Sequence, residues 1–150
     1  MGSEMCIRDR DYLVTARPTA VNIARAGIDI KRECGKLVSS DFDVKKTKEE
    51  MILFIEKMLE DDVKDNIAIG DHGAKHIIEN VDKDIVVLTH CNAGALATVG
   101  YGTAVGVIRS LQKFEKLKHV YCTETRAYNQ GARLTAYELC LLYTSDAADE

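Results

Sequence analysis

Cys91 is the side chain in this sequence that is best placed to take part in catalysis. It follows the apolar, β-branched run 84–90 and precedes the turn residues Asn92 to Gly94. We expect a helix to begin directly after this turn, and the positive end of its dipole would favour the nucleophilic thiolate. Asn92 and the N–H groups around Gly94 could donate hydrogen bonds to a developing oxyanion. Position alone leaves open the alternative of a buried cysteine that packs as a small apolar side chain.

A second set of polar residues could bind an anionic group. Gln130 and Gly131 lie at the start of a predicted helix, and helix N-termini attract anions. Arg17 precedes Pro18, which is favoured at the first position of a helix. Because arginine grips phosphate with two parallel hydrogen bonds, Arg17 and Gln130 together would make a suitable phosphate site.

Other candidate groups are weaker. His90 could act as a base, but its side chain could equally point to the other face of the strand. His72 and His76 lie four residues apart without a third ligand nearby, so we predict no metal site. Residues 100–102 and Gly106 imitate part of a dinucleotide fingerprint, but we expect them to lie inside a helix and not in a strand–helix turn.

The second half of the chain contains the elements that would position Cys91 and Gln130. The uninterrupted β-branched run 84–90 is typical of a strand that is buried on both faces. A long helix over 95–114, a second strand over 119–123 and a second helix over 130–139 are expected to follow. Strand–helix–strand–helix with short links indicates a parallel, Rossmann-like sheet, in which ligands bind at the carboxyl ends of the strands.

The first half indicates helices. Residues 44–60 carry apolar side chains at the i, i+3, i+4, i+7 spacing of an amphipathic helix that faces a core. A polar link is expected next, and then a short helix from Asp71, a plausible N-cap, to Glu79. The predicted fold class is therefore α/β, with a helical N-terminal part followed by the start of a truncated Rossmann-like sheet.

Both ends of the chain differ from the sequence around them. Residues 1–10 and 140–150 resemble peptides translated from sequencing-adapter DNA, and the alternative is a native polar tail at each end. Setting both ends aside as one would a tag leaves a helical N-terminal part with a linker over 11–82 and the first half of a Rossmann-like domain over 83–139. We therefore expect this chain to be an internal fragment of a longer enzyme.

Composition argues against several classes of protein. Hydrophobic residues make up 46% and charged residues 29% of the chain, as in an ordinary globular protein. The net charge of −4, without long basic runs, argues against a nucleic-acid partner. No apolar run approaches the roughly 20 residues that span a bilayer. Five cysteines without CxxC spacing favour a reducing compartment, so we predict a cytoplasmic protein with no membrane partner.

Four segments together resemble the methylthioribose-1-phosphate isomerase family: residues 15–22, 88–98, 101–104 and 124–139. The wider family includes regulatory subunits of translation initiation factor 2B and a ribose-1,5-bisphosphate isomerase. The combination of ThrHisCysAsnAlaGly with GlnGlyAlaArgLeuThr is specific, and the similarity spans nearly the whole chain between the two ends that were set aside.

The resemblance implies an aldose–ketose isomerase of methionine salvage. The implied reaction converts 5-methylthioribose 1-phosphate to 5-methylthioribulose 1-phosphate and needs no external cofactor. Cys91 would be one of two catalytic residues, and Arg17 and Gln130 would hold the substrate phosphate. The predicted substrate-binding set is Arg17, Gln130, Asn92, Gly94 and Gly131. A cysteine thiol fits proton transfer through an enediol-like intermediate, a dry apolar pocket would favour hydride transfer, and both routes stay open.

Two departures from the family pattern bear on activity. The family's second catalytic residue, an aspartate, lies on a later strand that this chain does not contain, and an upstream ArgGlyAlaPro-type phosphate loop is also absent. Asp146 and Asp149 are not substitutes because they lie in the end that was set aside, and Ala127 stands where a proline is usual. We therefore expect this chain by itself to be inactive.

Two alternatives remain on the same fold: a non-catalytic subunit like those of initiation factor 2B, and a ribose-1,5-bisphosphate isomerase. Cys91 argues against the first alternative, because those relatives generally lack a cysteine at this motif. The substrate of the full-length protein is expected to be a small sugar phosphate. The resemblance also implies a homodimer.

Overall fold

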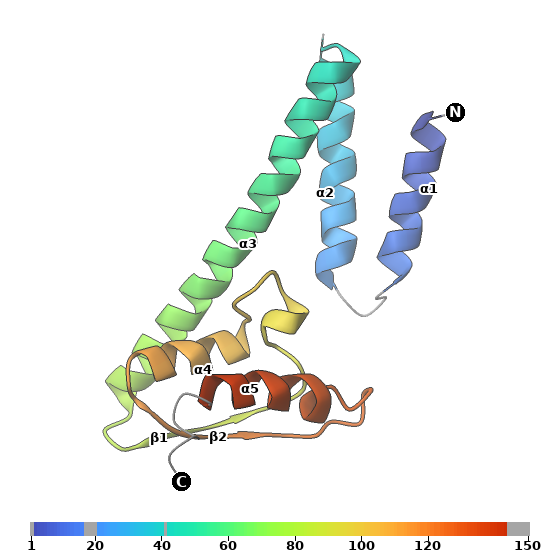
Figure 1. The fold of residues 1–150 in the computed structure, drawn as a ribbon. Coiled ribbons are helices and arrows are strands. Elements are labelled where there is room, and N and C mark those ends of the chain that lie inside the picture. The colour runs from blue at the N-terminus through green and yellow to red at the C-terminus, as the bar shows by residue number, and fades with distance from the viewer. Residues whose placement is uncertain (1, 17–20, 41, 144–150) are drawn as a thin grey trace. The chain divides into compact units, whose positions relative to one another are not determined.

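The computed structural model describes residues 2–16, 21–40 and 42–143 (Figure 1). In chain order its elements are helices α1 (Gly2–Thr15), α2 (Val21–Val38) and α3 (Val44–Asn80), strand β1 (Ile85–Thr89), the 3₁₀ turn η1 (Ala95–Ala97), helix α4 (Ala104–Lys113), strand β2 (Leu117–Cys122), the π-helical turn η2 (Gly131–Thr135) and helix α5 (Ala136–Tyr143). The chain forms two compact units, residues 1–58 and 59–150, which divide within α3.

The first unit consists of α1, α2 and the beginning of α3. Gly27 of α2 is buried, and a Cβ at this position would lie 3.0 Å from Val14 of α1, so the glycine allows the two helices to approach closely. The first turn of α3 is capped by Asp43, whose carboxylate accepts a hydrogen bond of 2.7 Å from the backbone nitrogen of Lys46. The prediction of a helical first half is confirmed.

Helix α3 is longer than the sequence suggested. The predicted polar link after residue 60 and the separate helix from Asp71 to Glu79 are wrong, because α3 continues to Asn80 without a break. No proline interrupts this stretch. Gly70 is buried, and a Cβ there would lie 2.7 Å from the carbonyl oxygen of Gly106 in α4. This glycine therefore permits close packing between two helices and does not end one.

The second unit contains a parallel pair of strands, β1 and β2, joined by α4. Val86 lies opposite His119, and the register runs on to Thr89 opposite Cys122. Two apolar clusters form the core around α4. They consist of Ala74, Ile85 and Leu111, and of Val105, Ile108 and Leu139. The predicted order of strand, helix, strand and helix, with a parallel pairing, is confirmed.

One face of this sheet is not covered by the described part of the chain. Val86, Leu88 and Tyr121 are each more than half exposed, whereas Ile85 and Thr89 on the opposite face of the sheet are buried. Helices α4 and α5 both lie on that opposite face (Figure 1). The expectation that β1 is buried on both faces is therefore wrong for the residues that the structure describes.

The segment after Cys91 is a loop where a helix was predicted. Only η1 is helical before Ala104, where α4 begins, so the predicted helix over 95–114 is wrong in its first half. The side-chain oxygen of Thr98 accepts hydrogen bonds from the nitrogens of Gly100 at 3.5 Å and Gly102 at 3.1 Å. Both glycines have positive φ angles, 151° and 87°. The hydrogen bonds to the Thr98 side chain and the positive φ angles of the two glycines favour a loop over a helix here.

The fingerprint-like residues 100–102 consequently lie in the loop before α4 and not inside a helix. This loop, residues 90–103, is called the Cys91 loop below. It separates β1 from α4 by many residues, so it is still not the tight strand–helix turn that a dinucleotide-binding motif requires.

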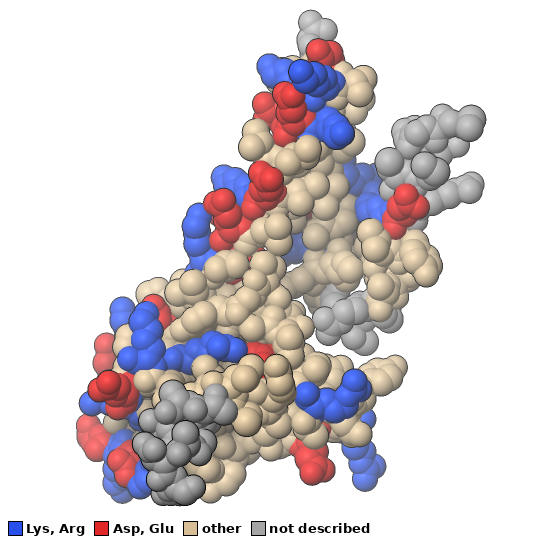
Figure 2. All heavy atoms as spheres, viewed as in Figure 1, with Lys and Arg blue, Asp and Glu red and all other residues tan. Residues whose placement is uncertain are grey.

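The surface of the described residues carries both signs of charge. Figure 2 shows acidic and basic side chains interspersed along α3, without an extended basic area on the visible face. Among the helices of the described ranges, none is both long and apolar enough to cross a membrane. Helix α1 runs through the predicted boundary at residue 10 and α5 through that at residue 139, and both boundaries stay predictions.

Candidate functional site

The loops that follow β1 and β2 meet at the carboxyl edge of the strands. The nitrogen of Thr123 donates a hydrogen bond of 3.1 Å to the carbonyl oxygen of Thr89. Beside it, the Thr123 hydroxyl lies 2.7 Å from Nδ1 of His90. Polar groups from two neighbouring parallel strands therefore come together at the edge where such sheets bind ligands.

Cys91 is partly buried and lies in an unusual backbone conformation. Its φ angle is 60°, in the left-handed region, which costs a non-glycine residue about 1–2 kcal/mol. The hydroxyl of Thr135, which is fully buried, donates a hydrogen bond of 2.5 Å to the Cys91 carbonyl oxygen. Strain of this kind tends to occur at functional sites.

The structure corrects the electrostatic argument for Cys91. The cysteine does not lie at the N-terminus of a long helix, because α4 begins only at Ala104 and η1 is a single short turn. A helix macrodipole acts on groups within the first turn, so that of α4 does not account for a reactive thiol at this position. Among the described residues, those of the loop and of the elements packed against it are the ones that hold the backbone at Cys91.

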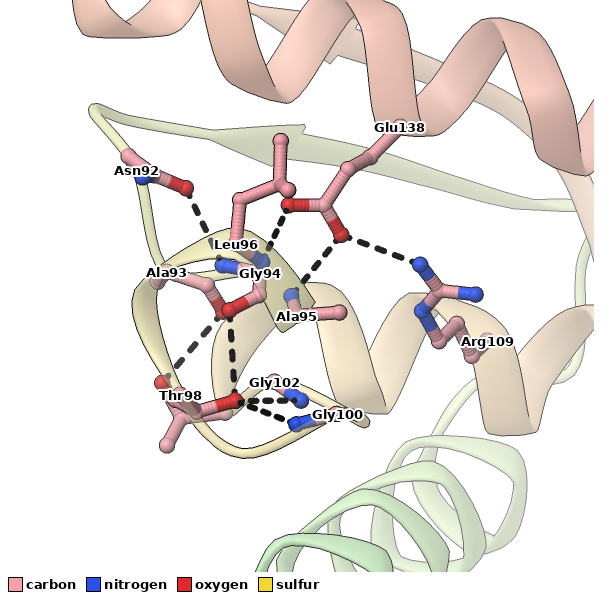
Figure 3. Close-up of polar contacts among 11 residues, drawn as sticks. Asn92, Ala93, Gly94, Ala95, Leu96, Thr98, Gly100, Gly102, Arg109 and Glu138 are labelled. Atoms are coloured by element: carbon pink, nitrogen blue, oxygen red, sulfur yellow. Dashed lines mark hydrogen bonds and ion pairs between the residues drawn. The ribbon is translucent and has the colours of Figure 1, made fainter.

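Glu138 of α5 is the residue that holds the Cys91 loop (Figure 3). The residue is 3% exposed, and its carboxylate accepts hydrogen bonds from the nitrogens of Ala95 at 2.8 Å and Leu96 at 3.1 Å. It also forms an ion pair of 3.0 Å with Arg109 of α4. The N–H groups that follow Gly94, which were expected to face an oxyanion, are therefore occupied by a side chain of the same chain.

Two glycines allow the loop to fold against this carboxylate. A Cβ at Gly94 would lie 2.2 Å from Oε1 of Glu138. A Cβ at Gly102, whose φ angle is 87°, would lie 2.7 Å from the Cα of Gly94. The nitrogen of Gly94 also donates a long hydrogen bond of 3.4 Å to Oδ1 of Asn92. Backbone approaches this close exclude any larger side chain at the two glycines.

The loop after β2 packs as tightly. A Cβ at Gly131 would lie only 1.7 Å from the carbonyl oxygen of Thr123, so the start of η2 rests directly on the end of β2. The nitrogen of Gly131 donates a hydrogen bond of 2.9 Å to the hydroxyl of Thr125. Gln130 is partly buried and directly precedes η2. Short π-helical turns such as η2 are rare in proteins, and those that occur are often found at functional sites.

Backbone strain is concentrated at this edge of the sheet. Among the described residues, five other than glycine have positive φ angles. Four of them, Cys91, Thr125, Tyr128 and Asn129, lie in the two loops that follow the strands, and the fifth is Glu115. An observed cluster of outliers supports a functional hypothesis for the place where it occurs.

The predicted substrate-binding residues are brought to one edge but not into direct contact. Asn92 and Gly94 lie in the Cys91 loop, and Gln130 and Gly131 lie at the start of η2. In the part of the chain that the structure describes, no hydrogen bond joins Gln130 to Cys91 or to either of these loop residues, and their roles toward a substrate stay predictions. Arg17 lies outside the described residues. No group of three or more His, Cys, Asp or Glu in the described ranges could hold a metal ion.

An open depression lies at the other edge, where the strands begin. Asp84, Glu115 and Lys118 are among the residues that line it. The carboxylate of Asp84 lies 2.5 Å from Nζ of Lys118, and this hydrogen bond, together with the opposite charge, raises the pKa of Lys118 above 10.5. Because ligands of parallel sheets bind at the carboxyl ends of strands, we place the candidate site at the Cys91 edge and not here.

Three residues of the site were not predicted from the sequence: Thr135, Glu138 and Arg109. One signal was available: Glu138 follows Thr135 by three residues on a predicted helix that is otherwise largely apolar, and charged residues are rarely buried without partners. The partners themselves could not be inferred, because Ala95 and Leu96 precede Glu138 by 43 and 42 residues.

Comparison with known proteins gives consistent matches. A sequence model of the Initiation factor 2 subunit family matches residues 4–142, which include part of both ends that were set aside. Methylthioribose-1-phosphate isomerase of Paracoccidioides brasiliensis (strain Pb18) is 52% identical over 148 residues, covering 91% of this chain and 38% of the relative. The protein of the same name from Drosophila pseudoobscura pseudoobscura is 52% identical over 138 residues, covering 86% of this chain and 38% of the relative.

Two solved structures are similar over most of this chain. The 5-methylthioribose 1-phosphate isomerase from Pyrococcus horikoshii OT3 gives a TM-score of 0.74 at 36% identity, covering 93% of this chain and 36% of that one. Translation initiation factor eIF-2B, subunit delta, from A. fulgidus gives a TM-score of 0.67 at 42% identity, covering 87% and 36%. The chain spans 38% of the length of the curated relatives it matches. With a family match over nearly its whole length, the chain belongs to the Initiation factor 2 subunit family.

Proposed function

We propose that the protein containing this chain is an aldose–ketose isomerase that converts 5-methylthioribose 1-phosphate to 5-methylthioribulose 1-phosphate in methionine salvage. The observation that carries this proposal is the 52% identity to two relatives named methylthioribose-1-phosphate isomerase. A partly buried cysteine in a strained loop, at the edge of a parallel sheet where ligands bind, supports it.

The proposed reaction moves hydrogen from C2 to C1 of the sugar and uses no external cofactor. Cys91 is the catalytic residue that this chain supplies, and its thiol suits the transfer of a proton at the reacting carbons. The substrate phosphate binds Arg17 and Gln130, next to the backbone of Gly131. Asn92 and Gly94 complete the substrate-binding loop beside the thiol.

The proposal extends to the setting of the enzyme. The protein works in the cytoplasm as a homodimer, with the small sugar phosphate as its partner and without nucleic acid or membrane. The mixture of acidic and basic side chains on the face that Figure 2 shows and the net charge of −4 support the absence of a nucleic-acid partner.

A second candidate is a non-catalytic subunit of an initiation-factor complex. The 42% identity to the delta subunit from A. fulgidus is the observation in its favour. Cys91 stands against it, since a protein without catalysis has no need of a thiol held in a left-handed conformation at the ligand edge of the sheet. Ribose-1,5-bisphosphate isomerase, the third possibility, differs from the main proposal only in its substrate.

Incubation of the purified full-length protein with the candidate substrates tests the proposal. Formation of the ketose from 5-methylthioribose 1-phosphate, followed by NMR, is the expected result, with little or no turnover of ribose 1,5-bisphosphate. Turnover of ribose 1,5-bisphosphate alone would show that the protein is a ribose-1,5-bisphosphate isomerase instead. A folded protein that converts neither sugar would favour the subunit.

A further inference from the structure

One face of the η2–α5 segment contacts both ends of residues 91–96. At one end, the Thr135 hydroxyl donates a hydrogen bond of 2.5 Å to the Cys91 carbonyl oxygen. At the other end, the Glu138 carboxylate accepts hydrogen bonds from the backbone nitrogens of Ala95 and Leu96. Residues three apart lie on the same side of a helical segment, so one rigid element fixes the whole stretch.

Both side chains are buried, and each is paired. Burial of a carboxylate is costly unless several donors satisfy it, and Glu138 has two backbone N–H groups and the guanidinium of Arg109 at 3.0 Å. An apolar side chain at position 138 would fill the space but would leave the N–H groups of Ala95 and Leu96 without their acceptor. A purely space-filling role does not explain an acid at this position.

The conformation of Cys91 depends on these contacts. A residue held at a φ angle of 60° relaxes to a more favourable conformation when the groups that restrain its backbone are removed. The direction of its Cβ, and with it the position of the thiol, would change with that relaxation. The hydrogen bond from Thr135 acts directly on the carbonyl group of this strained residue.

We infer that Thr135 and Glu138 are positioning residues, which hold the Cys91 thiol in the orientation that the reaction needs. This inference rests on the proposed function, in which Cys91 is the catalytic residue. Arg109 contributes by fixing the Glu138 carboxylate from the side of α4.

A pair of variants at Thr135 in the full-length protein separates positioning from packing. Thr135→Val keeps the shape of the side chain and removes the hydroxyl, whereas Thr135→Ser keeps the hydroxyl. We expect kcat of the valine variant to fall by about 100-fold with KM nearly unchanged, because small displacements of a reacting group have effects of this size. The serine variant should recover most of the lost activity.

A second measurement does not depend on turnover. The rate at which iodoacetamide alkylates Cys91, read by mass spectrometry beside the exposed Cys34, reports how the thiol is held. In both Thr135→Val and Glu138→Gln, iodoacetamide should alkylate Cys91 several-fold faster than in the wild type, because the released loop exposes the thiol. Glu79→Gln, at an exposed position of α3, is the matched control and should alkylate at the wild-type rate.

The two measurements test the positioning role separately from the proposed function. If the wild type converts no sugar, the proposed function fails, and the alkylation rates still decide whether the two residues hold the thiol. If folded Thr135→Val had the kcat and the Cys91 alkylation rate of the wild type, the inference would be overturned. An equal loss of kcat in the valine and serine variants would also overturn it. Circular dichroism establishes folding, and the Thr135 pair decides alone if Glu138→Gln does not fold.

Discussion

The backbone of Gly94 lies so close to the carboxylate of Glu138 that no side chain fits between them. A Cβ at position 94 would be 2.2 Å from Oε1 of Glu138, well inside van der Waals contact. Since Glu138 is itself held by Arg109 and by two backbone nitrogens, it cannot move aside without breaking those bonds. The observed packing of the Cys91 loop against α5 therefore requires glycine at position 94.

Replacement of this glycine should damage the loop. We expect Gly94→Ala to lower the free energy of unfolding by about 1–3 kcal/mol, the usual cost of overpacking, and to reduce isomerase activity. Urea denaturation of the full-length protein measures the first effect. Gly35→Ala is the control, because Gly35 lies in α2 with nothing within 4 Å of an added Cβ. Equal stability of the two variants would show that Glu138 does not constrain the loop.

A partly buried hydrogen-bond network joins α3 to α4 and the Cys91 loop. The hydroxyl of Ser110, which is fully buried, lies 2.8 Å from that of Tyr101 and donates a hydrogen bond of 2.7 Å to Asp71. Ser110→Ala should cost about 1–2 kcal/mol, because it removes the hydrogen bonds of a fully buried hydroxyl to the partly buried side chains of Tyr101 and Asp71. Unfolding by urea would reveal the loss. Ser39→Ala, which removes only an exposed hydrogen bond, should change the free energy of unfolding by less than about 0.5 kcal/mol.

A double-mutant cycle tests whether this network acts as a unit. If it does, Ser110→Ala combined with Tyr101→Phe should cost less than the sum of the two single variants, because they share one hydrogen bond. Strict additivity would mean that the 2.8 Å contact between the two hydroxyls contributes nothing.

Much of the second unit could be predicted from the sequence. The β-branched run before Cys91 gave β1, and the alternation of strands and helices gave a parallel sheet. The loop at 98–103 could not be predicted from apolar periodicity, because Thr98 and the positive φ angles of Gly100 and Gly102 override it. Residues 100–102 were expected inside a helix, whereas Gly70, which was expected to follow a linker, lies within α3 and allows close packing against α4.

Only part of the candidate site could be predicted from the sequence. Cys91 could be singled out because the turn residues after a buried strand are a local pattern. Glu138 could not, since its contacts depend on how α5 folds back over the Cys91 loop, 43 residues away in the case of Ala95. The sequence also could not show that only one face of β1 is buried, because the packing of helices on a sheet depends on the tertiary structure.

Gln130 should act on binding more than on the chemical step. We expect Gln130→Ala to raise KM about tenfold or more with a small change in kcat, because a hydrogen bond to a charged phosphate is worth about 1.5–3 kcal/mol. Steady-state kinetics with the proposed substrate measures both constants. Gln112→Ala in α4, away from the two loops, serves as the control. A fall in kcat at constant KM would contradict a phosphate-binding role.

The Lys118–Asp84 pair should make a small, alkaline-sensitive contribution to stability. Asp84 raises the pKa of Lys118, first through its hydrogen bond and then through its charge. The contribution is therefore fully present below the ordinary value of 10.5 and is lost as the pH rises through the higher value in the folded protein. NMR titration of the Lys118 side chain should show a lower pKa in Asp84→Asn, and an unchanged pKa would contradict the pairing.

The most direct test of the account compares two cysteine variants of the full-length protein in the isomerase assay. Cys91→Ser keeps the size of the side chain and removes the thiol, and Cys34→Ser does the same at an exposed position of α2. We predict that Cys91→Ser lowers kcat for 5-methylthioribose 1-phosphate by at least about 100-fold, in the range typical of an acid or base, while Cys34→Ser keeps wild-type activity. Wild-type turnover by a folded Cys91→Ser variant would contradict the account.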